Sequence, residues 1–283
     1  MREPSQATTR WRTRPGRLEI SLSTARFRPT PDTSEPVATR VAGPVVVVPR
    51  RFSLGDDPRV IAANELFDRI VDLVADAGLT PLVVDDPFVA LSGVSGLVLP
   101  GGGDINPQRY GQATTEVVYD VNDEQDELDF TLAARAQDAG LPVLGICRGA
   151  QVLNVLRGGD LQIDLVPSEV PHRSVTAGEL FGWHTVALTA DSRVHAAHDS
   201  DRIVVASAHH QGIASLGAGL VATGYAADGL IESFEAVDGW VLAVQWHPEA
   251  PGTSEAVRRA PFVALARRIE SAATPDRSAP TAC

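Results

Sequence analysis

The sequence contains no lysine, since all 24 of its basic residues are arginines. This absence excludes a phosphate-binding loop that depends on lysine, a lysine Schiff base and a pyridoxal-phosphate anchor. Cysteine is almost as scarce, because the chain has only Cys147 and Cys283. Two cysteines do not make a disulfide framework, and they fit a reducing compartment better than an oxidising one. We therefore expect a cytoplasmic protein.

The sequence also lacks a long apolar run and an excess of positive charge. No apolar run approaches the length that a membrane-spanning helix needs. A formal net charge of -12 argues against a general nucleic-acid binder, which needs a basic surface. The expected partner is a small-molecule substrate, with neither nucleic acid nor membrane involved, and formation of a homo-oligomer is left open.

The N-terminal segment differs in composition from the rest of the chain. Residues 1–40 are rich in arginine, serine, threonine and proline and poor in acids. A targeting leader has such a composition, but no amphipathic helix or signal-type apolar region stands out. We therefore predict a disordered extension over residues 1–40, a single domain over residues 41–272 and a disordered tail over residues 273–283.

The apolar pattern after residue 40 indicates alternating strands and helices. The β-branched run at residues 45–48 suits a strand that is covered on both faces. Residues 60–77 repeat apolar side chains at helical spacing and stop at Gly78. Residues 82–84 and 96–99 are the next two expected strands. This order predicts an α/β fold with a doubly wound, mostly parallel sheet and helices on both faces.

The second half of the chain predicts smaller strands near the end of the sheet, and a final helix. The expected strands cover residues 161–165, 183–188, 203–206, 220–225, 230–235 and 241–245, and the helix covers residues 261–271. His184 is expected to be structural, whereas His195 and His198 stand in a polar stretch and are expected to be solvated. The same is expected of Arg50 and Arg51, which follow the first strand.

The most informative stretch is residues 141–159, LPVLGICRGAQVLNVLRGG. It predicts a buried strand, a sharp turn at Cys147 and an apolar helix that ends at a glycine pair. Gly145 and Gly149 flank the turn in the pattern G-x-C-x-G, which is a nucleophile elbow with sulfur in place of oxygen. A helix N-terminus beside the sulfur favours the thiolate. The alternative is that Cys147 is a small buried hydrophobic residue, and this stretch alone does not decide between the two.

A second polar group follows the strand expected at residues 241–245. His247 and Glu249 stand two residues apart at the end of that strand. Such a pair can supply a general base and the carboxylate that orients it. Its presence favours the nucleophile interpretation of Cys147.

Three consecutive glycines, Gly101, Gly102 and Gly103, directly follow the strand expected at residues 96–99. A phosphate loop is excluded, because the Lys-Ser/Thr ending is missing. Glycines let the backbone present its N–H groups to an anion, so an oxyanion-binding loop fits, and a plain tight turn is the alternative.

Two groups of side chains could suggest metal binding. Residues 120–129 contain six acids, but they lack the glycine and the alternating ligands of a calcium loop. They are explained either as the acidic first turn of a helix or as a field that attracts cationic substrates. The adjacent His209 and His210 would point in opposite directions from an extended segment, which makes a poor metal site. We expect no metal and no cofactor.

Four motifs, in this order, resemble those of the class I (triad) glutamine amidotransferases, and within them the gamma-glutamyl-gamma-aminobutyrate hydrolase branch, peptidase family C26. They are LVLPGGGDINPQRYG at residues 97–111, PVLGICRGAQVLNVLRGG at 142–159, SAHHQG at 207–212 and VQWHPE at 244–249. The resemblance covers roughly residues 43–270, and four motifs in order are far more specific than any one of them. The chain departs from the family at Gln125, where relatives often carry the arginine of an Arg-Asp pair. The resemblance implies a flavodoxin-like fold with a nucleophile elbow.

The resemblance also implies site residues. Cys147 is the expected nucleophile, His247 the expected acid and base, and Glu249 the residue that orients the imidazole. The implied oxyanion hole consists of the N–H groups of Gly102 and Arg148, although the three glycines are hard to separate. The implied substrate-binding residues are Gly101, Gly103, Gln151, Ser207 and His209.

The implied activity is hydrolysis of the γ-glutamyl amide of a small amine, a polyamine or aminobutyrate conjugate, through a glutamyl-thioester. The alternative is a glutaminase subunit that supplies ammonia to a separate synthetase partner. A non-catalytic relative is the third interpretation, and the intact Cys147, His247 and Glu249 argue against it. The PGGGDINP and CRGAQ segments favour the free-standing hydrolase over the glutaminase, and analogy of fold takes the choice no further.

Overall fold

The computed structural model describes residues 43–53, 57–176 and 178–273. The extension predicted for residues 1–40 and residues 274–283 of the predicted tail lie outside the described residues, whereas Ala273, where the tail was predicted to begin, is the last residue of a helix. Within the described part, the predicted order of strands and helices is present, with three elements that the sequence did not indicate.

A parallel sheet forms the half of the fold that carries Cys147. Its strands lie side by side in the order β2-β1-β3-β4-β11. Their bounds are Val45–Pro49 for β1, Thr80–Val84 for β2, Val94–Leu99 for β3, Val143–Ile146 for β4 and Val241–Val244 for β11. Val46, Val47 and Val48 are fully buried, as expected for a strand covered on both faces.

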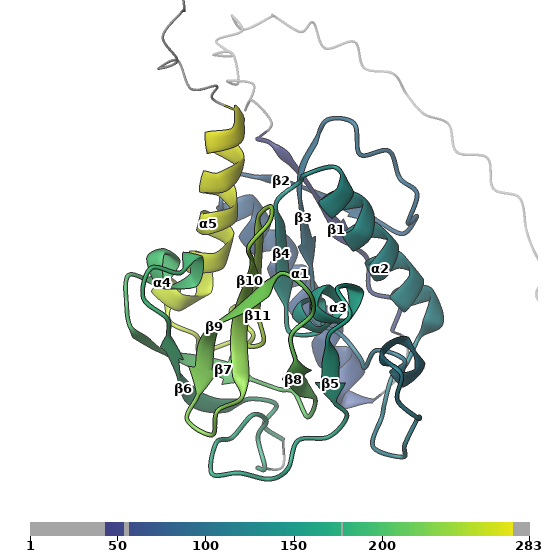
Figure 1. Cartoon of the computed structure of the whole chain (residues 1–283), viewed down its shortest axis with the longest axis vertical. Coiled ribbons are helices and arrows are strands. Elements are labelled where there is room, and N and C mark those ends of the chain that lie inside the picture. The colour runs from purple at the N-terminus through teal and green to yellow at the C-terminus, as the bar shows by residue number, and fades with distance from the viewer. Residues whose placement is uncertain (1–42, 54–56, 177, 274–283) are drawn as a thin grey trace, which may run out of the picture. The chain divides into compact units, whose positions relative to one another are not determined.

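Helices cover both faces of this sheet, which confirms the predicted fold class. Helices α1 (Pro58–Asp76) and α5 (Glu255–Ala273) pack on the face that includes Val46 and Val48. Helices α2 (Asp123–Asp138) and α3 (Arg148–Leu156) pack on the opposite face, with Val47. Figure 1 shows α5 and α2 on opposite sides of the sheet. Two separate hydrophobic cores result, one for each face.

An antiparallel extension continues the sheet beyond β11. It consists of β10 (Ile231–Ala236), β9 (Leu220–Ala226), β6 (Gly182–Leu188) and β7 (Arg202–Ser207), in that order. Two short strands, β5 (Asp160–Gln162) and β8 (Gly212–Ser215), pair with each other at its side. Helix α4 (Arg193–His198) and the 3-10 helix η1 (Pro107–Tyr110) complete the described elements. The sequence predicted none of β8, α4 and η1.

Two predicted boundaries are wrong by more than two residues. Strand β5 ends at Gln162 rather than at residue 165, because it pairs only with the short β8. Helix α5 begins at Glu255 and holds Pro261 in its interior, whereas the sequence suggested a start at the proline. Proline in a helix interior costs about 3 kcal/mol. Burial of Val257 and Ala260 on the preceding turns offsets part of that cost.

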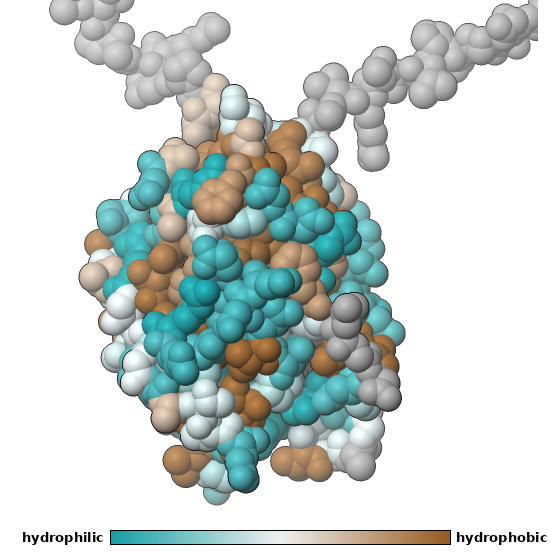
Figure 2. All heavy atoms as spheres, turned by 90° about the vertical axis from the view of Figure 1, so that its right-hand side faces the viewer, coloured by the Kyte–Doolittle hydropathy of each residue, from teal (hydrophilic) through white to brown (hydrophobic). Residues whose placement is uncertain are grey.

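The outer face of α2 is polar, and Asp123, Glu124 and Glu127 are exposed on it. Figure 2 shows this side of the molecule, where hydrophobic residues form separate patches among hydrophilic ones. Among the residues that the structure describes, none of the helices is both long and apolar enough to span a membrane.

His198 is not solvated, contrary to the sequence-based expectation. Its ring lies 6.1 Å from the ring of the fully buried Trp246, measured between centroids. Its Nε2 atom is buried and has no hydrogen-bond partner within the described residues. Burial without a partner disfavours the charged form and lowers the pKa of His198 to about 4.

This burial predicts a specific sensitivity to acid. The unfolded chain, with an ordinary histidine pKa of about 6.5, takes up the proton more readily than the folded chain. The stabilisation is therefore complete above about pH 6.5 and is lost as the pH falls toward about 4. We expect His198→Asn to reduce the acid-induced loss of unfolding free energy by on the order of 2 kcal/mol, measured by urea denaturation between these pH values. His195→Asn is the control, and parallel pH profiles for wild type and His198→Asn would contradict the prediction.

Candidate active site

Cys147 lies in a sharp turn between β4 and α3, as the G-x-C-x-G pattern predicts. Its backbone angles are φ 49° and ψ -106°, a conformation that non-glycine residues rarely adopt. Its N–H donates to the carbonyl of Val244 at 2.8 Å, and its own carbonyl accepts from Ala150 and Gln151. The side chain is 6% exposed. The turn therefore holds the sulfur at the end of the sheet, beside the N-terminus of a helix.

The two glycines of the elbow are required by close backbone contacts. A Cβ atom on Gly149 would lie 2.2 Å from the carbonyl oxygen of Leu99 on β3. A Cβ atom on Gly145 would lie 2.6 Å from a methyl group of Leu153 and 2.8 Å from the carbonyl oxygen of Gly149. Only glycine lets β3, β4 and α3 approach so closely, which explains why Gly145 and Gly149 flank the turn.

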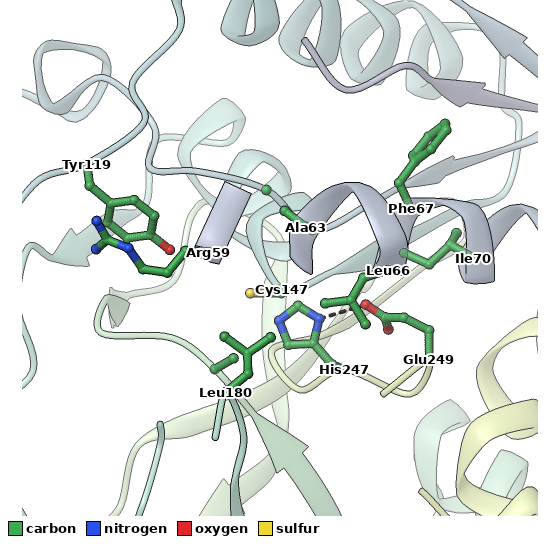
Figure 3. Close-up of a pocket in the computed structure, with 13 residues that line it drawn as sticks. Arg59, Ala63, Leu66, Phe67, Ile70, Tyr119, Cys147, Leu180, His247 and Glu249 are labelled. Atoms are coloured by element: carbon green, nitrogen blue, oxygen red, sulfur yellow. Dashed lines mark hydrogen bonds and ion pairs between the residues drawn. The ribbon is translucent and has the colours of Figure 1, made fainter. Parts of the chain in front are cut away.

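His247 and Glu249 follow β11, the strand that pairs with β4. The Nδ1 atom of His247 lies 2.6 Å from Oε1 of Glu249, and both side chains are buried. The backbone N–H of His247 donates to Ala206 at the end of β7 at 2.8 Å, so the antiparallel extension helps to hold the histidine. Figure 3 shows the sulfur of Cys147 and the carboxylate of Glu249 on opposite sides of the imidazole ring. The predicted nucleophile, histidine and carboxylate are thus brought together.

The charge state of His247 depends on its two neighbours. Burial by itself lowers the pKa of His247, but the charges of Cys147 and Glu249 outweigh burial and raise that pKa well above its usual value. The imidazole is therefore held in its protonated form beside the sulfur. A protonated imidazole at this position can act as an acid for a leaving group.

Gln245 is a neighbour of the sulfur that sequence reasoning missed. Its Nε2 atom lies 3.6 Å from the sulfur of Cys147, and its Oε1 accepts from Gln151 at 3.4 Å. Both glutamine side chains are buried. The available signal was spacing, because Gln245 precedes His247 by two residues. The predicted substrate contact Gln151 therefore packs beneath the sulfur, against Gln245 and the carbonyl of Gln211.

The glycine loop lies directly over the elbow, and its three members face different groups. A Cβ on Gly101 would lie 3.0 Å from Cε1 of His247, and one on Gly102 would lie 3.1 Å from Cδ of Arg148. Gly101 and Gly102 line the pocket above Cys147. Gly103 packs instead against Asp120, whose carbonyl oxygen would lie 2.4 Å from an added Cβ. Gly103 is thus placed behind the pocket rather than on its lining.

The side chain of Arg148 is buried beneath the elbow and forms ion pairs with Asp126 and Asp129 of α2. Asp129 also pairs with Arg51 at 2.5 Å. Arg51 is buried, so the expectation that it is a solvated loop residue is wrong. The interpretation of the acidic run as a field for cationic substrates is also wrong for Asp126 and Asp129, because buried arginines neutralise both carboxylates.

Ser207 and His209 lie beside the pocket wall rather than on it. Ser207 is fully buried, and its hydroxyl lies 2.9 Å from Nε2 of His184. His209 Nδ1 lies 2.8 Å from the carbonyl oxygen of Gln211. Ala208, between them, lines the pocket. The extended backbone alternates its side chains, so the two predicted contacts point away from the pocket.

His210 points away from His209, as the sequence argument expected. Its Nε2 atom lies 2.9 Å from Asp104 and its Nδ1 atom lies 3.1 Å from Asp164. His209 faces Glu232 and His172 instead. These three residues form a buried group with ligand atoms of the kind that bind metals, which the sequence did not indicate.

The remaining wall of the pocket comes from α1 and two loops. Its apolar residues are Ala63, Leu66, Phe67, Ile70 and Leu180. Arg59 and Tyr119 stand at the other side, with the guanidinium 3.9 Å from the centroid of the tyrosine ring. Arg59 also pairs with Asp57 at 2.7 Å. The pocket thus combines an apolar wall with one arginine, as Figure 3 shows.

The elbow geometry predicts that Gly149→Ala is strongly destabilising. The added methyl group has to displace the backbone of Leu99, which is central in the sheet, so we expect a loss of about 1–3 kcal/mol or more in unfolding free energy. Glu65→Ala on the exposed side of α1 is the control and is expected to change it by less than about 0.5 kcal/mol. Chemical denaturation measures both, and an equal stability of Gly149→Ala and wild type would refute the close approach.

Comparison with known proteins places this geometry in a family. The family model of Peptidase C26 matches residues 44–249, a range that contains the elbow, His247 and Glu249. The glutamine amidotransferase-like protein YvdE of Lactococcus lactis is 32% identical over 192 residues, which are 65% of this chain and 80% of that protein. The gamma-glutamyl-gamma-aminobutyrate hydrolase of Escherichia coli O157:H7 is 27% identical over 217 residues, 71% of this chain and 85% of that enzyme.

A solved structure shares the fold. A candidate GMP synthase component from Thermoplasma acidophilum superposes with a TM-score of 0.57 and 19% sequence identity, over 81% of this chain and 96% of that protein. At this identity the likeness shows the fold alone. The family model spans most of the chain and includes Cys147, His247 and Glu249. The chain therefore belongs to the peptidase C26 family and is a glutamine amidotransferase-like hydrolase.

Proposed function

We propose that this chain hydrolyses the γ-glutamyl amide bond of a small γ-glutamyl amine and releases glutamate and the free amine. One observation carries the proposal: the strained, buried Cys147 faces an imidazole that Glu249 holds from the other side. This arrangement provides a nucleophile, a proton donor and an orienting carboxylate in one line. The name of the Escherichia coli relative, a gamma-glutamyl-gamma-aminobutyrate hydrolase, supports the same bond as the target.

The reaction proceeds in two steps. The Cys147 thiolate attacks the γ-carbonyl carbon, and the protonated His247 gives its proton to the departing amine, which leaves a glutamyl-thioester on the sulfur. His247, now neutral, takes a proton from a water molecule that attacks the thioester. Cleavage of the carbon–sulfur bond releases glutamate and restores the thiolate. Glu249 keeps the proton on Nδ1, so that Nε2 faces the reacting atoms throughout.

The negative charge that develops on the carbonyl oxygen during the attack needs hydrogen-bond donors near the elbow. The N–H of Arg148 belongs to the first turn of α3, where N–H groups have no carbonyl partner within the helix. We assign the second donor to Gly102, which lies against the Arg148 side chain. Each such donor contributes on the order of 3–4 kcal/mol to transition-state stabilisation. The buried Asp126 and Asp129 hold the Arg148 side chain and so keep this turn in place.

The apolar wall of the pocket favours hydrolysis of a γ-glutamyl amine over hydrolysis of glutamine. In glutamine the leaving group is ammonia, which has no hydrocarbon part to bury. The side chains of Leu66, Phe67 and Ile70 provide a surface that suits the carbon chain of a larger amine. The glutaminase that serves a separate synthetase therefore remains the second candidate.

The charges on the lining favour an aminobutyrate conjugate over a polyamine conjugate. The acidic lining residue Glu249 is bound to His247, whereas the guanidinium of Arg59 lies at the other side of the pocket. A carboxylate at the far end of the leaving amine could pair with Arg59, although Asp57 shares that charge. A polyamine tail would place a cation beside the same arginine.

The first prediction concerns the nucleophile. Cys147→Ala is expected to lower the turnover of a γ-glutamyl amine by about a thousandfold or more, because the thioester cannot form. Thermal unfolding of the variant shows whether the fold is intact. Cys283→Ala is the matched control and is expected to keep full activity. A folded Cys147→Ala protein that retains a tenth of the wild-type rate, about 1.4 kcal/mol, is incompatible with this mechanism.

The second prediction concerns the leaving group and the need for a partner. The chain alone is expected to release glutamate from γ-glutamyl-aminobutyrate with a higher kcat/KM than from a γ-glutamyl polyamine. Arg59→Ala is expected to lower the first value about tenfold, the equivalent of one charged hydrogen bond, and to leave the second unchanged or raised. Arg69→Ala, an exposed arginine of the same helix, is the control.

Two outcomes would contradict this assignment. A higher efficiency with the polyamine conjugate that Arg59→Ala does not change would remove Arg59 from leaving-group recognition. Activity that appears only with glutamine and an added synthetase would support the glutaminase interpretation instead.

A further inference from the structure

A buried group of three side chains lies beside the active site, and the proposed mechanism does not use it. His172 comes from the segment between β5 and β6, His209 follows β7, and Glu232 belongs to β10. We call these residues the His-His-Glu cluster. One ligand atom of each residue lies within 4.8 Å of the others, and the exposed fractions are 7%, 5% and 0%.

The cluster contains several buried polar atoms that lack a hydrogen bond. Both carboxylate oxygens of Glu232, Nδ1 of His172 and Nε2 of His209 have no partner of acceptable geometry within the described residues. A buried carboxylate without a partner is costly, and most folded proteins avoid it. Four such atoms close together indicate that the cluster binds an additional group.

The outward-facing ring nitrogens of His172 and His209 fix the tautomer of each imidazole, and the tautomers indicate that a cation is needed. Nδ1 of His209 lies 2.8 Å from the carbonyl oxygen of Gln211, which can only accept, so Nδ1 carries the proton. Nε2 of His172 lies 2.9 Å from a carboxylate oxygen of Asp228, so the proton is on Nε2. In their neutral forms both histidines then present a lone pair to the carboxylate of Glu232. Two lone pairs and an anion repel one another unless a cation lies between them.

Two of the distances within the cluster are close to those of a tetrahedral metal site. Oε1 of Glu232 lies 3.1 Å from Nδ1 of His172 and 3.7 Å from Nε2 of His209. Metal–ligand bonds of about 2.0–2.1 Å in tetrahedral geometry place neighbouring ligand atoms about 3.4 Å apart. The Asp228 carboxylate and the Gln211 carbonyl hold the outer ring nitrogens, which is how metal-binding histidines are usually oriented.

We propose that His172 Nδ1, His209 Nε2 and the carboxylate of Glu232 bind a divalent metal ion, and that zinc is the ion that fits best. Two imidazoles and one carboxylate are a set that zinc accepts, with a water molecule in the fourth position. Nε2 of His184 also lies 3.6 Å from Oε1 of Glu232, but the hydroxyl of Ser207 lies nearer to it, at 2.9 Å, so His184 is not needed as a ligand. This inference does not depend on the proposed function.

The site would join the pocket wall to the sheet. The segment that carries His172 also carries Leu180, which lines the pocket, and Phe181, whose ring packs on His247 at 5.6 Å between centroids. The backbone carbonyl of Glu232 accepts the backbone N–H of Gln245 at 2.8 Å, and the side chain of Gln245 reaches the sulfur of Cys147. A metal ion between His172 and Glu232 would therefore fix this wall relative to the catalytic strand, in a positioning role.

The test uses the full chain without a histidine tag and with Cys147→Ala and Cys283→Ser, so that no thiol competes for the metal. Protein freed of metal with a chelator is titrated with zinc by calorimetry. We expect one zinc ion per chain, protection of the segment before β6 from limited proteolysis, and, with cobalt, the visible absorption of a tetrahedral complex.

Three variants and one control locate the site. Glu232→Gln keeps the shape of the ligand, and His172→Asn removes an imidazole, so each is expected to weaken zinc binding more than about 100-fold. Asp228→Asn, which removes only an orienting partner, is expected to weaken it about 10–100-fold. His195→Asn, a histidine outside the cluster, is expected to bind zinc like the parent protein. Circular dichroism shows that each variant is folded.

The proposal is overturned if the thiol-free protein shows no saturable binding of zinc. It is also overturned if Glu232→Gln and His172→Asn, both folded, bind zinc as tightly as the His195→Asn control. In either case protonated histidines would supply the positive charge around Glu232.

Discussion

The strained backbone at Cys147 is the constraint on which the rest of the structure depends. A non-glycine residue at φ 49° and ψ -106° costs on the order of 1–3 kcal/mol and persists only where its surroundings leave no alternative. Those surroundings are β4 on one side and the fully packed α3 on the other, brought together by Gly145 and Gly149. The turn keeps the sulfur at the sheet edge, beside the helix N-terminus and His247.

A helix that is buried on all sides can carry a charged residue only if partners are buried with it. Arg148 meets Asp126 and Asp129, which stand one turn apart on the same face of α2, and Arg51 completes the group from the loop after β1. Removing one partner of such a network usually costs several kcal/mol, because the other charge stays buried. The sequence suggested that Asp126 and Asp129 contribute to a negative surface field, but in the structure they stabilise the elbow through Arg148.

The antiparallel extension adds the second half of the site. His247 is held through its backbone by the end of β7, and Phe181 packs on its ring from the segment before β6. The same extension brings His172, His209 and Glu232 together next to the strand that carries Gln245. Cys147 thus comes from the parallel half, whereas the surroundings of His247 come largely from the antiparallel half.

Local sequence determined most of the elements and the sharp turn at Cys147. The valine run of β1, the periodicity of α1 and the G-x-C-x-G turn each depend on neighbours within a few residues, so they could be predicted. Only the tertiary structure decided that Arg51, Asp126 and Asp129 are buried partners of Arg148, that Ser207 and His209 point away from the pocket, and that Glu232 meets two histidines. These pairings join residues far apart in the chain, and they depend on strand order and on the depth of burial, which no local pattern specifies.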